Sequence, residues 1–237
     1  VPARTAVRPV RPYPDVDHVV IISIDGLRPD RLLLAHTPTL RGLIARGAYT
    51  FWAKTTALGT TLPSHTSMLT AVKPRKHGIL WNTDLPLKAA IYSNYPTLFE
   101  LARRAGYTTA MAAGKTKFNG LNKPGTIQHV DVSTKDEVED ESVTVAAESM
   151  IAAHQPEVLF IHFPAVDYAG HKYGWASVEQ LATIEKVDGQ VQRIFTALAR
   201  AGLTERTVVM LTSDHGGAGK THGQEDDPRS RHIPWIM

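Results

Sequence analysis

Three apolar stretches of this 237-residue sequence each lead into an aspartate, and two of these aspartates are followed closely by a histidine. The aspartates are Asp25, Asp167 and Asp214, with His171 four residues after the second and His215 directly after the third. Gathered in one place, these groups would repel one another and lose their hydration unless cations neutralised them. Mixed carboxylate and imidazole ligation suits zinc, with manganese as a harder alternative. The set therefore predicts a divalent metal site, although each aspartate taken singly is typical of a turn or cap.

A second stretch, residues 60–70, is rich in hydroxyl groups and follows Gly59. Thr61 falls where a helix N-cap is expected, and Pro63 lies just inside the helix, where its missing N–H costs nothing. A hydroxyl at a helix N-terminus lies beside unpaired N–H groups in a positive field, which favours an alkoxide and an incoming anion. Thr61 is therefore either a simple cap or the attacking group in a reaction on an anionic substrate.

The elements that must position these residues alternate between strand and helix. Continuous apolar runs with many β-branched residues predict buried strands at 18–24, 158–163 and 207–212, and a further strand is expected at 107–113. Apolar periodicity and end signals predict helices at 37–47, 96–104, 142–154 and 178–201. This order predicts an α/β fold with a mostly parallel sheet covered by helices on both faces. The aspartates then lie at the C-terminal ends of strands, where open α/β sheets bind their ligands.

The composition narrows the class of protein. With 43% hydrophobic and 21% charged residues, the sequence is that of a globular chain with material for one large core, and we expect a single catalytic domain over residues 1–237. Residues 1–16 are expected to form an extended leader, and the polar residues 119–141 a surface excursion. The net charge of +3 and the lack of a dense basic run with interleaved aromatics argue against nucleic-acid binding. No apolar run approaches the roughly 18 residues of a membrane span.

The absence of cysteine and the two chain ends bear on localisation. Without Cys the protein has no disulfide, no thiolate metal ligand and no Cys nucleophile. This composition, and a chain that starts at Val1 rather than Met, fit a trimmed and exported protein, periplasmic or secreted. The sequence stops at Met237 inside a predicted strand, so we expect the natural protein to continue.

Five motifs together resemble the alkaline phosphatase superfamily, in particular its nucleotide pyrophosphatase/phosphodiesterase-like branch of type I phosphodiesterases. In family order they are Ile24-Asp25-Gly26, Thr61-Leu62-Pro63-Ser64-His65, His77-Gly78-Ile79-Leu80-Trp81-Asn82, Asp167-Tyr168-Ala169-Gly170-His171 and Ser213-Asp214-His215-Gly216. They span most of the chain, and as an ordered set they are highly specific. The resemblance implies an alkaline-phosphatase-like fold, with a mixed, mostly parallel sheet between helices and two metal ions at its C-terminal edge.

The resemblance also implies how the metal ligands are shared between the two ions. One ion would be surrounded by Asp25, Thr61, Asp214 and His215. The other would be held by Asp167, His171 and a third histidine. His222 is the preferred third ligand because the family places a His-Gly shortly before an apolar strand, as His222-Gly223 stands here. His232, or a histidine beyond Met237, is the alternative.

The implied activity is phosphoric ester hydrolysis with Thr61 as the nucleophile and a phosphothreonine intermediate. Asn82 matches the family asparagine that donates to a non-bridging phosphoryl oxygen. Lys115 and Lys117 either bind an anionic group of the substrate, as in phosphonoacetate hydrolase-like relatives, or are solvated loop residues. We expect a small-molecule phosphodiester or nucleotide pyrophosphate as substrate, with a phosphomonoester or a phosphonate as the alternative. Ser64 stands where diesterase relatives often have Asn, which leaves that choice open.

Other classes of protein fit these residues less well. Gly114-Lys115-Thr116 is similar to the end of a P-loop, but Thr109 stands where the earlier glycine belongs, which argues against an NTPase. Sulfatases of the superfamily need a Cys or Ser that becomes formylglycine, and a Thr cannot. A phosphomutase would need an extra domain, for which residues 119–141 are too few. An inactive metal-binding relic of the fold is the non-enzyme alternative.

Overall fold

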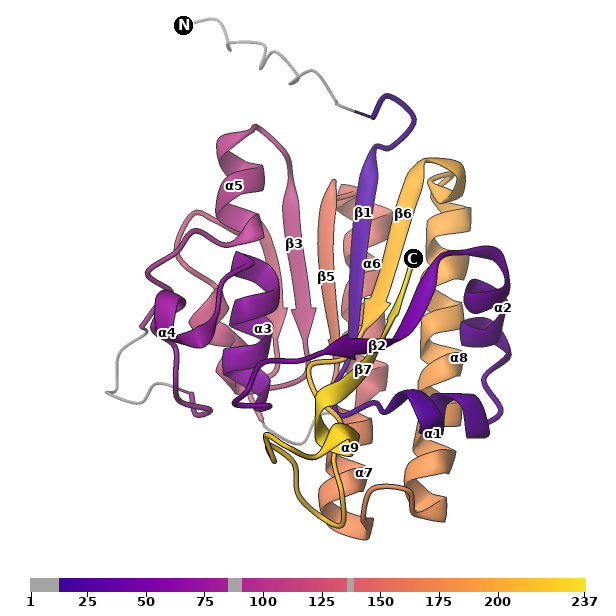
Figure 1. The fold of residues 1–237 in the computed structure, drawn as a ribbon. Coiled ribbons are helices and arrows are strands. Elements are labelled where there is room, and N and C mark those ends of the chain that lie inside the picture. Colours follow the sequence, from indigo (N-terminus) through magenta and orange to yellow (C-terminus); the bar gives the residue numbers. More distant parts are fainter. Residues whose placement is uncertain (1–12, 85–90, 136–138) are drawn as a thin grey trace, which may run out of the picture.

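A single mixed sheet organises the structure, a computed structural model that describes residues 13–84, 91–135 and 139–237 (Figure 1). Its seven strands run in the order β2-β7-β6-β1-β5-β3-β4. Their bounds are β1 His18–Ile24, β2 Tyr49–Lys54, β3 Thr109–Ala113, β4 His129–Val132, β5 Val158–Phe163, β6 Thr207–Thr212 and β7 His232–Ile236. The strands from β6 to β4 are parallel neighbours, whereas β7 is antiparallel to both β6 and β2. The expectation of a mixed, mostly parallel sheet is confirmed.

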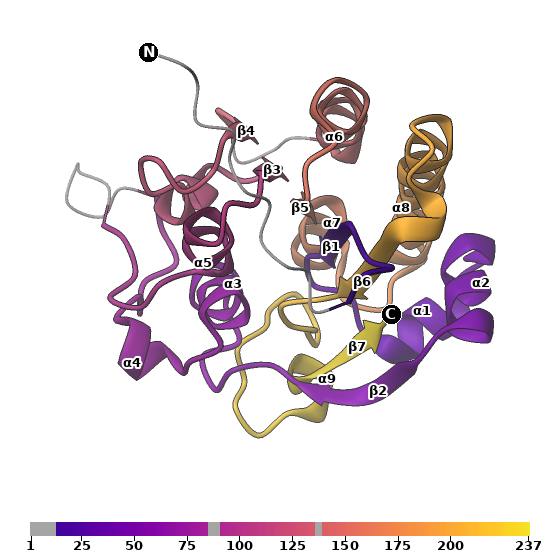
Figure 2. The ribbon, with the colours of Figure 1, turned by 90° about the horizontal axis from the view of Figure 1, so that it is seen from above.

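Helices cover both faces of this sheet. They are α1 Pro29–Leu34, α2 Pro38–Arg46, α3 Thr61–Thr70, α4 Pro74–His77, α5 Leu98–Arg104, α6 Asp140–His154, α7 Ala165–Tyr173, α8 Val178–Arg200 and α9 Pro228–Arg231, with 3-10 helices at Thr116–Leu121 and Thr204–Arg206. Seen from above, α3 and α5 lie on one side of the sheet and α6 and α8 on the other (Figure 2). Alternate residues of β1 face opposite layers, with Ile22 packed towards α6 and α8 and Ile21 towards α3 and α5. Two hydrophobic cores therefore share the central strands.

The apolar runs located the central elements well. The strands expected at 18–24, 158–163 and 207–212 are found with these bounds, and the strand expected from residue 107 begins at Thr109. Helix α3 begins at Thr61, so Thr60 is the N-cap residue and the placement of Thr61 as the cap was wrong by one residue. Within the described chain, the Thr60 side chain accepts no capping hydrogen bond.

The polar segment 119–141, expected to be a surface excursion, supplies part of the sheet. It contains β4, which pairs in parallel with β3 at the sheet edge. Leu121 and Ile127 of the same segment are buried in the core beneath α3 and α5. An edge strand with three half-buried residues and one exposed residue lacks the continuous apolar run that marks a central strand, so composition did not predict it.

The expected leader, residues 1–16, lies mostly outside the described residues. Among the helices that the structure describes, none has both the length and the apolar character needed to span a bilayer.

Helix α2 is fixed to α8 by a carboxylate rather than by its own cap. Asp188 of α8 is buried and accepts hydrogen bonds from the backbone N–H groups of Thr39, at 3.0 Å, and Leu40, at 2.8 Å. These groups belong to the first turn of α2, where N–H groups have no partner inside the helix. The negative charge also faces the positive end of the α2 dipole. Asp188 therefore does across the core what an N-cap does locally.

We predict that Asp188→Ala lowers the free energy of unfolding by about 3 kcal/mol, because two buried N–H groups lose a charged acceptor. Asp188→Asn should cost less, since one acceptor oxygen remains. Urea denaturation of the full chain measures both. The exposed Lys186 on the same helix provides the control, and Lys186→Gln should stay within about 0.5 kcal/mol of wild type. An Asp188→Ala protein as stable as this control would contradict the assignment.

Candidate metal centre

Neighbouring parallel strands deliver the chemically interesting side chains to one edge of the sheet, the lower edge in Figure 1. Asp25 directly follows β1, and Asp214 comes shortly after β6. Strand β5 leads into α7, which carries Asp167 and His171 one turn apart, and Lys115 follows β3. Because the C-terminal ends of parallel strands meet at one edge, residues far apart in sequence become neighbours.

A first triad consists of Asp25, Asp214 and His215, whose candidate ligand atoms all lie within 4.8 Å of one another. The Nε2 atom of His215 is 3.3 Å from Oδ1 of Asp25 and 3.2 Å from Oδ2 of Asp214. All three side chains are buried. This is the grouping that the sequence predicted around one ion, apart from Thr61.

A second triad consists of Asp167, His171 and His222, again within 4.8 Å. Oδ1 of Asp167 lies 3.4 Å from Nε2 of His171 and 3.9 Å from Nε2 of His222. The rings of His222 and His215 stack with centroids 3.7 Å apart, so the two triads adjoin. The rival candidate, His232, lies instead at the start of β7, with its ring 5.4 Å from that of Trp52. The structure thus brings His222 to the centre.

Backbone carbonyls fix the tautomer of all three histidines in the triads. The Nδ1 atoms of His171, His215 and His222 lie 3.0, 2.9 and 2.8 Å from the carbonyl oxygens of Lys220, Gly216 and Gly59, respectively. A carbonyl can only accept, so each Nδ1 must carry the proton. In the neutral ring, each Nε2 then keeps its lone pair and points it at the aspartates. This arrangement is the one that metal-binding histidines usually have.

Each aspartate likewise has one oxygen engaged and one left over. Oδ1 of Asp214 accepts from the backbone N–H groups of Gly26 and His215, whereas Oδ2 of Asp25 and of Asp167 bind the Lys115 ammonium. The remaining oxygens, Asp214 Oδ2, Asp25 Oδ1 and Asp167 Oδ1, are buried and find no hydrogen-bond partner among the described residues. The Nε2 atom of His215 is likewise buried and has no hydrogen-bond partner among the described residues.

Buried polar atoms without partners are costly and rare in native proteins. Here they converge on one place and combine carboxylate oxygens with imidazole nitrogens. That is the donor set of zinc sites, and it also suits manganese. The residues present therefore fit divalent metal ions on the chemistry of this structure alone.

Burial and neighbouring charges shift the pKa values of the ionisable groups in different directions. Burial and the neighbouring Asp25 raise the pKa of Asp214 to about 7. Burial alone would also raise the pKa of Asp25, but the Lys115 ammonium and the His162 hydrogen bond hold it well below its usual value. For His222, burial and the adjacent His215 lower the pKa to about 4. For His215, burial lowers the pKa, but the Asp214 and Asp25 carboxylates outweigh it and raise the pKa above its usual value. Asp214 and His215 are therefore the groups from which a cation displaces a proton near neutral pH.

The backbone around Thr61 is linked by hydrogen bonds to side chains at both triads. Thr61 is the first residue of α3 and is 1% exposed. Two residues before it, the Gly59 carbonyl accepts from His222 of the second triad. Its own carbonyl accepts at 2.7 Å from Nδ1 of His65, which lies 3.6 Å from Oδ2 of Asp214 in the first triad. The helix end is therefore tied to the metal centre from both sides.

Asn82 is attached to the same helix end. Its Oδ1 accepts from the backbone N–H of Leu62 at 2.9 Å. Because an N–H needs an acceptor, the amide oxygen must face α3, and the NH2 group is left to donate elsewhere. This orientation is the one that the predicted donor to a phosphoryl oxygen requires.

Close packing behind the triads explains several small residues. The indole of Trp175 donates to the Gly26 carbonyl at 2.9 Å, and its ring lies edge-on against His171 and His222. A Cβ on Gly170 or Gly217 would come within 2.7 or 2.4 Å of this indole, closer than real atoms approach. Trp175 therefore fits against the second triad only because glycines stand beside it.

Sequence reasoning missed a buried polar layer behind the first triad. The Nε2–H group of His162 donates to Oδ2 of Asp25 at 2.9 Å, and Ser23 bonds Nε2 of His65 at 2.8 Å. Ser23 and His162 lie inside apolar strands, on β1 and β5, and polar residues in such runs are the signal that could have revealed them.

The two lysines expected near the substrate occupy different environments. Lys115 is 3% exposed and binds the aspartates instead of standing open on a loop. Lys117 is half-buried in the 3-10 helix that follows.

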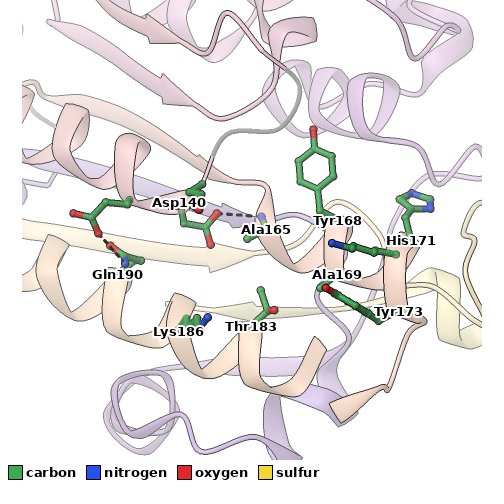
Figure 3. Close-up of a pocket in the computed structure, with 12 residues that line it drawn as sticks. Asp140, Ala165, Tyr168, Ala169, His171, Tyr173, Thr183, Lys186 and Gln190 are labelled. Atoms are coloured by element: carbon green, nitrogen blue, oxygen red, sulfur yellow. Dashed lines mark hydrogen bonds between the residues drawn. The ribbon is translucent and has the colours of Figure 1, made fainter. Parts of the chain in front are cut away.

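An open groove of about 910 Å³ borders the second triad, between α6, α7 and α8 (Figure 3). His171 lies at one end of this groove, and Tyr168 and Lys186 also line it. The His171 side chain is 43% exposed, whereas the side chains of the first triad are buried. The second triad is thus the one that solvent reaches from this side.

Comparison with known proteins agrees with this geometry. A family model described as type I phosphodiesterase / nucleotide pyrophosphatase matches residues 19–225. A bovine bis(5'-adenosyl)-triphosphatase, ENPP4, is 25% identical over an alignment of 213 residues, and the match covers 84% of this chain and 47% of that protein. The chain therefore spans about half the length of the curated relatives it matches.

Solved structures share the fold. Murine ectonucleotide pyrophosphatase/phosphodiesterase 5 superposes with a TM-score of 0.71 at 21% identity, over 84% of this chain and 57% of that one. A 2-O GAG sulfatase gives a TM-score of 0.70 at 16% identity, over 93% and 64% of the two chains. The fold is that of the alkaline phosphatase superfamily, and the chain belongs to the type I phosphodiesterase/nucleotide pyrophosphatase family within it.

The ionisation of the first triad predicts a pH dependence of metal binding. Asp214 has a raised pKa of about 7, so below that pH a cation must displace its proton. His215, whose pKa the neighbouring carboxylates raise despite burial, holds a second proton that a cation displaces. Zinc affinity of the metal-stripped chain should therefore rise with pH between 6 and 7 by up to about tenfold per unit for each proton displaced. His222, with a pKa of about 4, is neutral throughout this range and should not contribute. Calorimetric titration in buffers of different ionisation enthalpy counts the released protons, and binding without proton release at pH 6 would contradict this assignment.

Proposed function

We propose that this chain is a two-metal hydrolase that cleaves phosphodiester or nucleotide pyrophosphate bonds through a phosphothreonine at Thr61. The observation that carries the proposal is the pair of adjoining Asp/His triads, with the start of α3 linked to them through the Gly59 and Thr61 carbonyls. One ion would be held by Asp25, Asp214 and His215, with the Thr61 hydroxyl, and the other by Asp167, His171 and His222. When bound, the two ions would supply positive charge that lowers the pKa of a coordinated hydroxyl and stabilises the phosphoryl oxygens.

The chain's own residues account for the two chemical steps. The Thr61 oxygen attacks phosphorus in line, an Oγ1–P bond forms, the bond to the leaving oxygen breaks and the hydroxyl proton leaves with solvent or the leaving group. A water oxygen then attacks the same phosphorus, the Oγ1–P bond breaks and Thr61 regains its proton. The first turn of α3 offers a positive field to the phosphoryl group throughout.

Asn82 would stabilise charge as it builds on phosphorus. Since its oxygen is held by Leu62 N, the NH2 group is preorganised as a donor and needs no reorientation during the reaction. His65 would set the position of the helix end, because it joins the Thr61 carbonyl to the hydroxyl of Ser23.

The relatives favour nucleotide-type substrates. The bovine relative is a bis(5'-adenosyl)-triphosphatase, and the murine structure is an inactive threonine-to-alanine variant in complex with AMP. The murine variant supports a threonine-dependent reaction, and both relatives support a substrate with a nucleoside phosphate end. Human relatives are named ectonucleotide enzymes, which supports our proposal that this chain, too, acts outside the cytoplasm.

The competing functions are less well supported by the geometry. A phosphonate substrate was suggested by two lysines open to an anionic group, but the Lys115 ammonium is buried between two aspartates. An inactive relic would be expected to have lost some ligands, whereas both triads are complete in ligand type. Hydrolysis of a phosphomonoester at the same site is the remaining alternative.

We predict that Thr61→Ala lowers kcat by at least about 1,000-fold, because the nucleophile is lost, while zinc content stays nearly the same. Thr61→Ser should keep measurable turnover and form a covalent phosphoserine. When the reaction is stopped during turnover, mass spectrometry of the peptide that contains residue 61 detects the phosphorylated residue. Full activity in Thr61→Ala would refute the mechanism.

A second prediction concerns Asn82. Asn82→Ala should lower kcat about 100-fold and change KM little, because its NH2 group acts where charge develops. Asn82→Asp should be worse, since it replaces the donor by a like charge beside the phosphoryl group. An effect confined to KM would assign Asn82 to ground-state binding instead.

The substrate class is tested by the ratio of kcat/KM for bis-p-nitrophenyl phosphate to that for p-nitrophenyl phosphate, with zinc supplied. The proposal predicts a ratio well above one, because a diesterase pocket accommodates a second ester group. A ratio well below one would show a site adapted to the doubly charged end of a monoester, and the monoesterase alternative would replace the proposal.

A further inference from the structure

The environment of Lys115 links the two triads. Its Nζ lies 2.7 Å from Oδ2 of Asp25, in the first triad, and 2.6 Å from Oδ2 of Asp167, in the second. The side chain enters from the end of β3, while Asp167 lies on α7 beyond the neighbouring strand β5. One cation therefore hydrogen-bonds a ligand candidate of each triad at the same time.

The bonds to Lys115 also select which oxygen each aspartate offers to a metal. In both residues Oδ2 is engaged by the ammonium and Oδ1 is left without a partner among the described residues. Oδ1 of Asp25 is the oxygen that approaches His215 Nε2, at 3.3 Å. Oδ1 of Asp167 is the oxygen that approaches Nε2 of His171, at 3.4 Å. Lys115 thus lies on the side of the carboxylates away from the His171 and His215 nitrogens. At Asp25 it shares Oδ2 with His162, and at Asp167 it is the partner of Oδ2 that the structure shows.

The surroundings of Lys115 shield it from solvent. The residue is 3% exposed, and its Nζ lies 5.2 Å from the centre of the Tyr168 ring, close enough for a cation–π interaction. The two carboxylates raise its pKa despite burial, so the ammonium is charged at any working pH. A buried cation that is fully paired is expensive to disturb, which makes it a rigid spacer.

We propose that Lys115 is a positioning residue of the metal centre: it turns Oδ1 of Asp25 and Asp167 towards the metals and holds the two triads at a fixed separation. The inference rests on the proposed metal centre, but it concerns a residue that coordinates neither ion. A ligand belongs to one triad, so its loss should weaken one site. Lys115 belongs to both, so its loss should weaken both sites together.

The test is zinc titration of the metal-stripped full chain, with chelator competition to resolve two affinities. Wild type should bind two ions, and Lys115→Met, similar in length but uncharged, should bind both at least about tenfold more weakly. His171→Gln should weaken one site only. Lys186→Gln, which removes an exposed lysine from α8, should leave both affinities unchanged. Cobalt in place of zinc gives an independent readout, because an Asp167 freed to bind through both oxygens would raise the coordination number and weaken the visible absorption of Lys115→Met.

The outcomes separate this inference from the proposed function. Failure of the wild-type chain to bind two ions would overturn the metal centre itself. Two ions in wild type with unchanged or tighter binding in Lys115→Met would overturn only the positioning role, since Lys115 would then be a counter-ion that metals displace. Should Lys115→Met fail to fold, the crystal structure of zinc-loaded wild type decides. The Lys115 ammonium bound to both Oδ2 atoms supports the inference, and an ammonium that has left them overturns it.

Discussion

Three carboxylates buried within a few ångströms of one another are the constraint on which the rest of this structure depends. Such groups repel and cannot be hydrated, so each needs a partner that the fold supplies. Backbone N–H groups hold one oxygen of Asp214, and the Lys115 ammonium holds one oxygen of Asp25 and of Asp167. The oxygens that remain face histidine nitrogens and are matched by no protein donor among the described residues. The protein thus neutralises half of the site itself and leaves the other half to cations.

The fold satisfies this constraint through its parallel strands. Because β6, β1, β5 and β3 are neighbours running the same way, loops separated by many residues in sequence open at one edge. The helices supply the site residues that the strands do not carry. Thr61 begins α3, which lies on one face of the sheet, and His171 belongs to α7, which follows β5 at the C-terminal edge. Trp175, packed against two glycines, keeps the second triad in place.

The sequence predicted the parts of this arrangement that depend on local pattern. Long apolar runs gave the central strands, and residue types near their ends gave Asp25, Asp167, His171, Asp214 and His215. His222 and the division into two triads came from the family resemblance. The edge strand β4 escaped prediction because its burial comes from pairing rather than from its own composition. Lys115 was placed on a loop near substrate, since nothing in the spacing shows that a side chain from β3 reaches across β5. The resemblance favoured His222 over His232, and tertiary contacts place His222 beside Asp167 while His232 begins β7.

The central claim is that two adjoining triads hold two metal ions, and X-ray diffraction from zinc-loaded crystals on either side of the zinc absorption edge tests it most directly. The account predicts two anomalous peaks, one among Asp25, Asp214 and His215 and one among Asp167, His171 and His222. A single peak, or peaks away from both triads, would contradict it.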